Sequence, residues 1–225
     1  MPSSTVENYV KQIYVEQQEA GGGEQLVPMG KLAAAMGVVP GTATSMIQAL
    51  AKSGLVEYEP RTGVRLTKGG EQLALHVVRR HRLVELLLVQ VLGLDWSEVH
   101  DEAEELEHVI SDKVMERIDI LLGHPSVDPH GDPIPSARGT VPHDRYRPLS
   151  ECLPGFLGKV TRIVDQDAAF LQFVERCGLK PGANLRVETR DALADAVTVR
   201  PGDRKPVTLG TGAAGKILVE EIPTT

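Results

Sequence analysis

The chain has 225 residues, of which 41% are hydrophobic and 24% are charged, and its formal net charge is −7. This composition is typical of a globular protein with room for two domains, and the acidic balance argues against a simple basic nucleic-acid binder without excluding one. No apolar run has the length of a membrane span and the first residues resemble no signal peptide, so we expect a cytoplasmic protein without a membrane partner. Cys152 and Cys177 form no CxxC motif, which is typical of buried, reduced thiols.

The first 53 residues predict three helices. Residues 5–19 carry apolar side chains at helical spacing, and the glycines after Ala20 end that helix. Two shorter helices follow at about residues 31–36 and 42–52, with a break between Gly37 and Gly41. Two short helices around a tight turn are the layout of a helix-turn-helix motif, although other packed helix pairs share this pattern.

Two short strands, at residues 55–59 and 64–67, predict a β-wing directly after the third helix. Helices followed by a wing are the order of a winged-helix domain, whose partner is double-stranded DNA. Small polar residues early in the third helix suit the bases of a groove, and basic residues suit phosphates, although a solvated turn also accounts for Arg61. The candidate DNA-contacting residues are Thr42, Thr44, Ser45, Gln48, Lys52, Arg61 and Arg65.

A long helix is expected from about residue 67 to 91, and a second one runs through the acidic stretch to about Leu122. Glu104, Glu107 and His108 share a face of the second helix, and His100 lies one turn earlier. Carboxylates and imidazoles gathered in this way are the usual ligands of a divalent cation, although a solvated acidic face has the same pattern.

The long helix has two further features. His81 and Glu85 are four residues apart and share a face, although a lone histidine on an apolar helix is usually a core residue. The run Leu83–Val89 is apolar nearly all round, which favours burial in a subunit interface. We therefore expect a homodimer through residues of about 82–92 and 110–122.

The last hundred residues change character. Recurring prolines predict an irregular linker over residues 123–147, in which His124, His130 and His143 are interpreted as solvated. Five short strands and one short helix follow from Leu149, which predicts a small SH3-like barrel. The chain contains no GxGxxG, P-loop or GxSxG motif, so we expect neither an enzyme nor a small organic substrate.

Several segments together resemble the DtxR/MntR family of metal-dependent transcriptional regulators over nearly the whole chain. They are Glu7–Tyr14, the winged helix up to Gly69, Arg80–Glu85, Trp96–His100, Glu104-x-x-Glu107-His108 and the proline-rich segment 124–135. The resemblance implies a mainly α fold with β: a winged-helix DNA-binding domain (1–70), a helical dimerisation and metal-binding domain (71–123), a Pro/Gly-rich linker (124–148) and an SH3-like, FeoA-like domain (149–225). It implies a repressor of metal-homeostasis genes that binds palindromic operator DNA as a homodimer.

The resemblance also implies two metal sites. The primary site comprises Asn8, Glu104, Glu107 and His108, and the ancillary site comprises His81, Glu85, His100 and Gln166. Iron-type members have a cysteine where this chain has Glu104, so Mn²⁺ is expected, with Fe²⁺ as the alternative. Asn8 and Lys11 replace an aspartate and a glutamate of the manganese type, so the close-spaced ion pair of that type is not carried over.

Two other classes of protein fit parts of the sequence. Glu105-x-x-His108 also matches a motif of di-metal carboxylate enzymes, but a second Glu-x-x-His helix is missing and the winged helix stays unexplained. A winged-helix protein that needs no metal is the other alternative. An ion shared by Asn8 and the acidic helix would join the DNA-binding domain to the dimer core, so metal and DNA would strengthen each other's binding.

Overall fold

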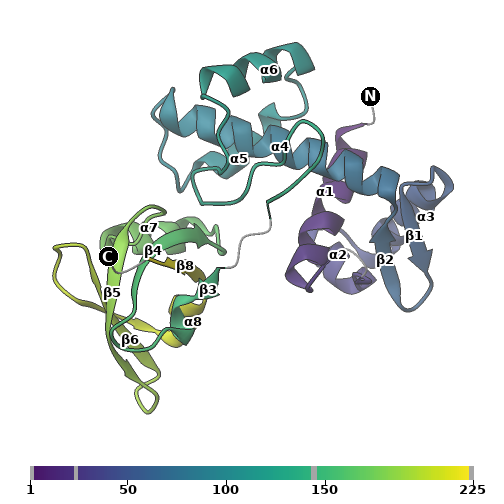
Figure 1. Ribbon diagram of the computed structural model, residues 1–225. Coiled ribbons are helices and arrows are strands. Elements are labelled where there is room, and N and C mark those ends of the chain that lie inside the picture. The colour runs from purple at the N-terminus through teal and green to yellow at the C-terminus, as the bar shows by residue number, and fades with distance from the viewer. Residues whose placement is uncertain (1–2, 23–24, 143–145, 223–225) are drawn as a thin grey trace. The chain divides into compact units, whose positions relative to one another are not determined.

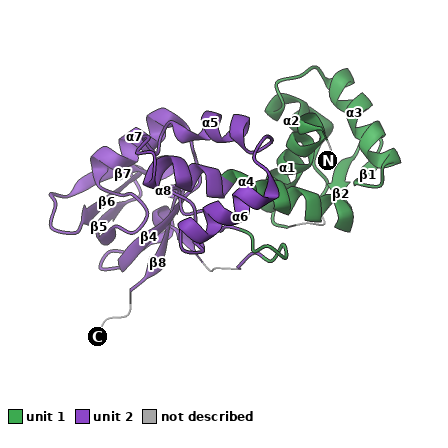
Figure 2. Cartoon of the chain, turned by 90° about the horizontal axis from the view of Figure 1, so that it is seen from above, with its two compact units in different colours: residues 1–81, 135–140 green, residues 82–134, 141–225 purple. Residues whose placement is uncertain are grey.

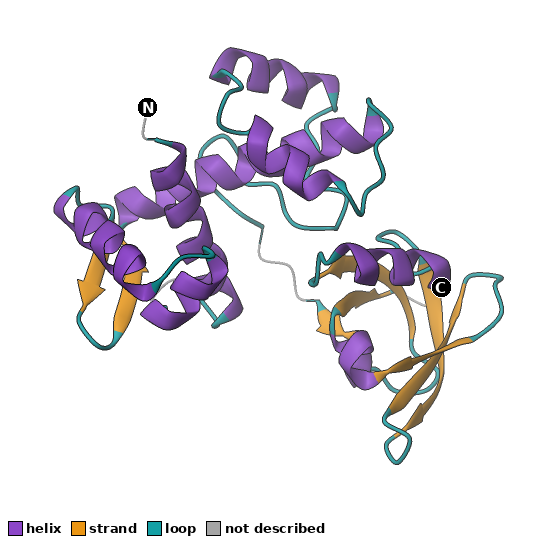
Figure 3. Cartoon of the chain, turned by 180° about the vertical axis from the view of Figure 1, so that it is seen from behind, coloured by secondary structure: helices purple, strands orange, loops and turns teal. Residues whose placement is uncertain are grey.

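The computed structural model describes residues 3–22, 25–142 and 146–222. The chain divides into two compact units (Figure 2), one formed by residues 1–81 with 135–140 and the other by residues 82–134 with 141–225. Helices make up most of the first 121 residues, and strands make up most of the segment after residue 146 (Figure 3). The interpretation of His143 falls outside the described residues.

The first unit contains the predicted winged helix. Its elements are α1 (Ser4–Glu19), α2 (Met29–Ala35), α3 (Pro40–Lys52), β1 (Val56–Glu59), β2 (Gly63–Leu66) and the first part of α4 (Lys68–Gln90), which continues into the other unit (Figure 1). β1 and β2 pair antiparallel, and the buried side chains of Ile13, Leu32 and Ile47 belong to the core beneath them. The Gln17 side chain accepts a hydrogen bond from the Leu66 amide at 3.3 Å, which ties the wing to α1.

The acidic segment was predicted as one helix, and that prediction is wrong. α5 (Val99–Leu106) ends before Glu107, and α6 (Asp112–Leu121) begins after a turn. Ser111 caps the second helix, since its Oγ accepts a hydrogen bond from the Val114 amide at 3.4 Å. A serine in this position satisfies an amide that the first turn leaves unpaired, so the chain can stop and restart here at low cost.

The apolar run on α4 is covered largely by the chain itself. Leu83, Val84, Leu86 and Leu88 are buried in a cluster that includes residues of α5, α6 and the following loop. The large apolar side chains left exposed nearby lie elsewhere, at Val91, Leu92, Val109, Val114, Ile120 and Leu121. A partner subunit would therefore meet the end of α4 and α6 rather than the whole run.

The C-terminal segment forms one sheet with the strand order β3-β8-β4-β5-β6-β7, in which all neighbours are antiparallel. The strands are β3 (Arg147–Pro148), β4 (Leu157–Ile163), β5 (Asn184–Asp191), β6 (Ala196–Pro201), β7 (Val207–Gly210) and β8 (Ile217–Glu221). A 3₁₀ turn (Leu149–Glu151), α7 (Ala168–Cys177) and α8 (Thr211–Gly215) accompany the sheet. Within the described residues β3 and β7 do not pair, so the sheet stays open, but the SH3-like prediction is confirmed.

The segment between α6 and β3 has neither helix nor strand in its described part, as its prolines predict. It contains one isolated bridge, between Val127 and Pro133, which closes a compact loop over residues 128–132. The Arg82 guanidinium holds this loop by donating to the Pro133 carbonyl oxygen at 2.5 Å. Among the described residues, no helix is both long and apolar enough to cross a membrane.

Candidate metal centre and nucleic-acid interface

Three predicted metal ligands come together at the end of α5. Glu104, Glu107 and His108 offer ligand atoms that all lie within 4.8 Å of one another. The Glu107 side chain is fully buried, and its Oε1 lies 3.4 Å from Nε2 of His108. Because the helix ends at Leu106, the turn turns Glu107 and His108 toward Glu104 without a continuing helix.

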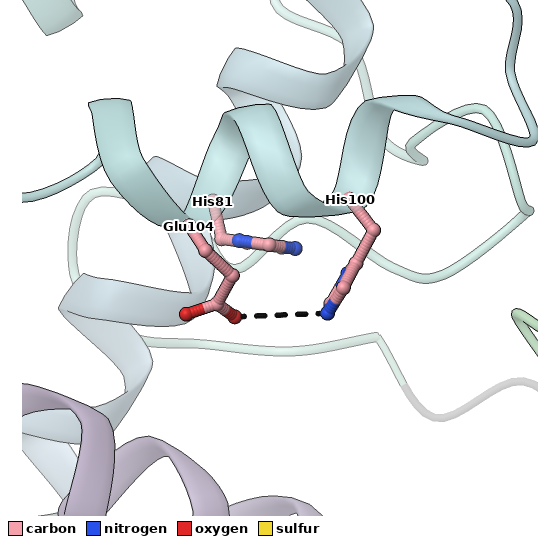
Figure 4. A group of neighbouring side chains, drawn as sticks. All are labelled: His81, His100 and Glu104. Atoms are coloured by element: carbon pink, nitrogen blue, oxygen red, sulfur yellow. Dashed lines mark ion pairs between the residues drawn. The ribbon is translucent and has the colours of Figure 1, made fainter.

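Glu104 also belongs to a second group, on α4 and α5, with His81 and His100 (Figure 4). Nε2 of His100 lies 3.8 Å from Oε1 of Glu104, and its Nδ1 lies 3.5 Å from Oε1 of Glu85. Glu104 thus has one carboxylate between two sets of imidazole and carboxylate donors. Of the four predicted ancillary ligands, His81, Glu85 and His100 are neighbours in this arrangement.

Gln166, the fourth predicted ancillary residue, is in none of these groups. Its Nε2 donates a hydrogen bond to Oδ2 of Asp132 at 2.8 Å. Asn8, predicted for the primary site, lies on α1, and its Oδ1 is buried without a hydrogen-bond partner in the described part of the chain. An amide oxygen in this state is a suitable metal ligand, because burial without a partner is otherwise costly.

A third group was not predicted, and it corrects the interpretation of His130 as solvated. Glu85, Asp128 and His130 are all buried, and they offer ligand atoms within 4.8 Å of one another. His124, by contrast, is exposed beside Asp119, as expected of a solvated residue. The compact loop buries His130 because its backbone packs closely, which the proline and glycine content of the linker concealed.

The Asp128 carboxylate uses one oxygen for the loop and presents the other to the group. Oδ1 accepts from the amides of His130 and Asp132 at 2.8 and 2.9 Å, whereas Oδ2 has no hydrogen-bond partner and lies 3.6 Å from Nε of Arg82. Burial, and next the charges of Asp132 and Glu85, raise the pKa of Asp128 well above its usual range. A cation at Oδ2 would oppose each of these effects.

The His130 ring is oriented for ligation. Its Nε2 lies 2.8 Å from the Trp96 carbonyl oxygen, which can only accept, so Nε2 carries the proton. The neutral ring then has its lone pair at Nδ1, which is buried without a hydrogen-bond partner and lies 3.9 Å from Oε2 of Glu85. Metal-binding histidines commonly hold their second nitrogen in this way. The signal in the sequence was three ionisable residues within the five positions from Asp128 to Asp132.

The predicted DNA-contacting residues of α3 reach the surface of the first unit. Thr42, Ser45, Gln48 and Lys52 are exposed, and Thr44 is half-buried. The hydroxyls of Thr44 and Ser45 donate to the carbonyl oxygens of Pro40 and Gly41 at 2.8 and 3.0 Å. Their oxygen lone pairs still face solvent, which suits acceptance of hydrogen bonds from base edges.

The two wing arginines differ in their surroundings. Arg61 is exposed at the turn and has a positive φ of 72°. Arg65 faces Glu57 across the β1–β2 ladder, and its Nε and Nη2 both lie 2.7 Å from Oε2 of Glu57. The carboxylate offsets the charge of Arg65, so Arg61 is the stronger candidate for a phosphate contact.

The domains match three family models. Residues 1–64 match the iron dependent repressor N-terminal DNA binding domain, residues 67–136 match the iron dependent repressor metal binding and dimerisation domain, and residues 147–221 match the FeoA domain. Together with the winged helix and the carboxylate–imidazole groups, these matches define a metal-dependent, DNA-binding transcriptional repressor.

Similar proteins agree with this class. The chain is 31% identical to the diphtheria toxin repressor of Corynebacterium glutamicum over 81% of this chain and 83% of that one. It is 29% identical to the iron-dependent repressor IdeR of Mycobacterium leprae over 97% of both chains. A solved manganese-dependent transcriptional repressor in complex with manganese is 42% identical, has a TM-score of 0.86, and is matched over 96% of this chain and all of that one. The chain belongs to the DtxR/MntR family of metal-dependent transcriptional regulators.

The buried Asp128 charge predicts a trade between stability and metal binding. Asp128→Asn should raise the free energy of unfolding without metal by on the order of 1 kcal/mol at pH 7, because it removes a poorly solvated charge. Since the pKa of Asp128 is raised, the advantage of the variant should shrink as the pH falls and the wild-type carboxyl is protonated. Urea denaturation with chelator present measures both effects, and a variant less stable than wild type at pH 7 would refute the account.

The wing predicts unequal effects for its two arginines. Arg61→Ala should weaken binding to a duplex selected from a random-sequence library and lower the slope of log affinity against log salt by about one. Arg65→Ala should change the slope less, because Glu57 already offsets its charge. Fluorescence anisotropy at several salt concentrations gives both slopes, and equal changes would contradict this assignment.

Proposed function

We propose that this protein is a repressor activated for operator binding by Mn²⁺. The observation that carries the proposal is the group of Glu104, Glu107 and His108, in which every donor is a carboxylate oxygen or an imidazole nitrogen. A donor set without thiolate suits Mn²⁺ or Fe²⁺ and does not favour softer ions. The similarity to a repressor solved with manganese supports Mn²⁺, and the similarity to IdeR makes Fe²⁺ the competing outcome.

The residues present fit a divalent cation. Glu104, Glu107 and His108 would hold a first ion, with His81 and His100 beside Glu104. Glu85, Asp128 and His130 would hold a second ion, in place of the ancillary set that included Gln166. A bound cation supplies positive charge where carboxylates otherwise face one another, and this offsets the cost of their burial.

Asn8 is proposed as the further ligand that brings α1 to the first ion. The proposal rests on the resemblance of Glu7–Tyr14 to the family and on the buried Oδ1 that lacks a hydrogen-bond partner. In this account the ion restrains the winged helix relative to the dimer core. One spacing of the two recognition helices is then selected, and it matches the half-sites of a palindrome.

The proposal predicts which histidine is indispensable. His108→Ala and Glu104→Ala should each abolish Mn²⁺-dependent binding to the selected duplex, because each removes a ligand of the first ion. His124→Ala, which changes an exposed histidine beside Asp119, is the matched control and should bind as wild type does. Binding of equal strength in chelator and in metal would sink the proposal, and activation by Fe²⁺ alone would favour the competing outcome.

Asn8→Ala tests the link to the winged helix. It should raise the Mn²⁺ concentration needed for half-maximal DNA binding by about tenfold, since an ion with fewer ligands binds less tightly. The helix should stay folded, because alanine is a good helix former. A Mn²⁺ titration identical to that of the wild type would show that Asn8 is not a ligand.

The exposed apolar residues predict where the dimer forms. Leu121 is 65% exposed on α6, so Leu121→Glu should shift the protein toward the monomer in sedimentation at micromolar concentration. Leu193→Glu introduces the same charge at a fully exposed leucine between β5 and β6, and it should leave the mass unchanged. A Leu121→Glu protein that remains dimeric would move the interface away from α6.

A further inference from the structure

The loop that carries Asp128 and His130 rests on the C-terminal sheet. The amide of Ile163 on β4 donates to the His130 carbonyl oxygen at 2.8 Å. Gly131 has a φ of +88°, and a Cβ there would lie 1.9 Å from the carbonyl oxygen of Thr161. Only glycine therefore allows the loop to approach β4 this closely. The approach occurs where β4 changes register against β8, between Val160 and Arg162, an irregularity that can redirect side chains.

Asp132 joins the loop to the C-terminal segment. Its carboxylate is buried, with Oδ1 lying 2.5 Å from Nη2 of Arg162 and 3.4 Å from Nη2 of Arg82. Oδ2 accepts from Gln166 at 2.8 Å. The Asp132 amide in turn donates to Oδ1 of Asp128, so the position of Asp132 fixes which Asp128 oxygen remains for the group.

Trp96 makes a second connection. Its carbonyl oxygen accepts from His130, and its ring stacks on the His130 ring with centroids 5.6 Å apart. From the C-terminal segment, Glu175 accepts from the indole Nε1 at 3.2 Å and Nζ of Lys180 lies 4.6 Å from the ring centroid. The indole is buried in the same apolar cluster as the sheet core. Contacts from α7 therefore set the group that orients His130.

We propose that the C-terminal domain controls metal affinity at the Glu85–Asp128–His130 group without donating a ligand, through Arg162 and Gln166 as positioning residues that hold Asp132. The inference rests on the proposed second ion. Both side chains touch Asp132 and neither is among the gathered ligand atoms. Because coupling is reciprocal, an ion at this group must also strengthen the seating of the C-terminal domain on the loop.

The chain offers a direct test. In the His108→Ala background, which removes a ligand of the first ion, Mn²⁺ is titrated while the emission of Trp96, the one tryptophan in the chain, is followed. Calorimetry of the same titration gives the dissociation constant independently. Gln166→Ala and Arg162→Gln should each weaken Mn²⁺ binding by about ten- to a hundredfold, the usual effect of losing groups that orient ligands. Arg162→Lys should recover part of the affinity, because it restores a cation beside Asp132.

Lys159→Gln is the matched control. Lys159 lies on the same strand, but it pairs with Glu220 at 3.9 Å on the exposed side, so its loss should leave Mn²⁺ affinity unchanged. Unchanged affinity in both Gln166→Ala and Arg162→Gln would overturn this inference while leaving the second ion in place. If the His108→Ala protein shows no Mn²⁺ binding that Asp128→Asn removes, the second ion itself fails, and the inference fails with it.

Discussion

The structure depends on the placement of carboxylates and imidazoles where water cannot solvate them fully. Glu85, Glu107 and Asp128 are buried, and each shares its surroundings with a histidine. Buried carboxylates repel one another and lose hydration, so they require either protons or positive charge nearby. Arg82 and Arg162 supply part of that charge beside Asp128 and Asp132. A divalent cation supplies the remainder, which makes the folded core responsive to metal.

This requirement gives each domain a role. α4 and α5 provide helical ligands, the turn after Leu106 adds Glu107 and His108, and the compact loop adds Asp128 and His130. The winged helix provides the surface for DNA, and the FeoA domain stabilises the loop through β4 and α7. Metal binding and domain arrangement are then one equilibrium, because an ion that favours one arrangement is favoured by it in turn.

Periodicity predicted most of the fold, since winged helix, long helix and C-terminal strands all have local signals. The missed break at Ser111 shows how an apolar period can continue across a helix cap. Glu104, Glu107 and His108 were predicted as a group and are gathered, because their spacing is local. His130 was misread because its burial depends on contacts with β4 and Trp96, which are distant in sequence. Gln166 was placed near the loop, but only the structure shows that its partner is Asp132.

The central claim is that these groups hold Mn²⁺. Crystals grown with Mn²⁺, measured at its absorption edge, test it directly, since anomalous difference density locates the ion without assumptions about ligands. The account predicts one peak among Glu104, Glu107 and His108 and another among Glu85, Asp128 and His130. Fully occupied Mn²⁺ peaks elsewhere, with none at either group in a protein that binds DNA only with Mn²⁺, would contradict it.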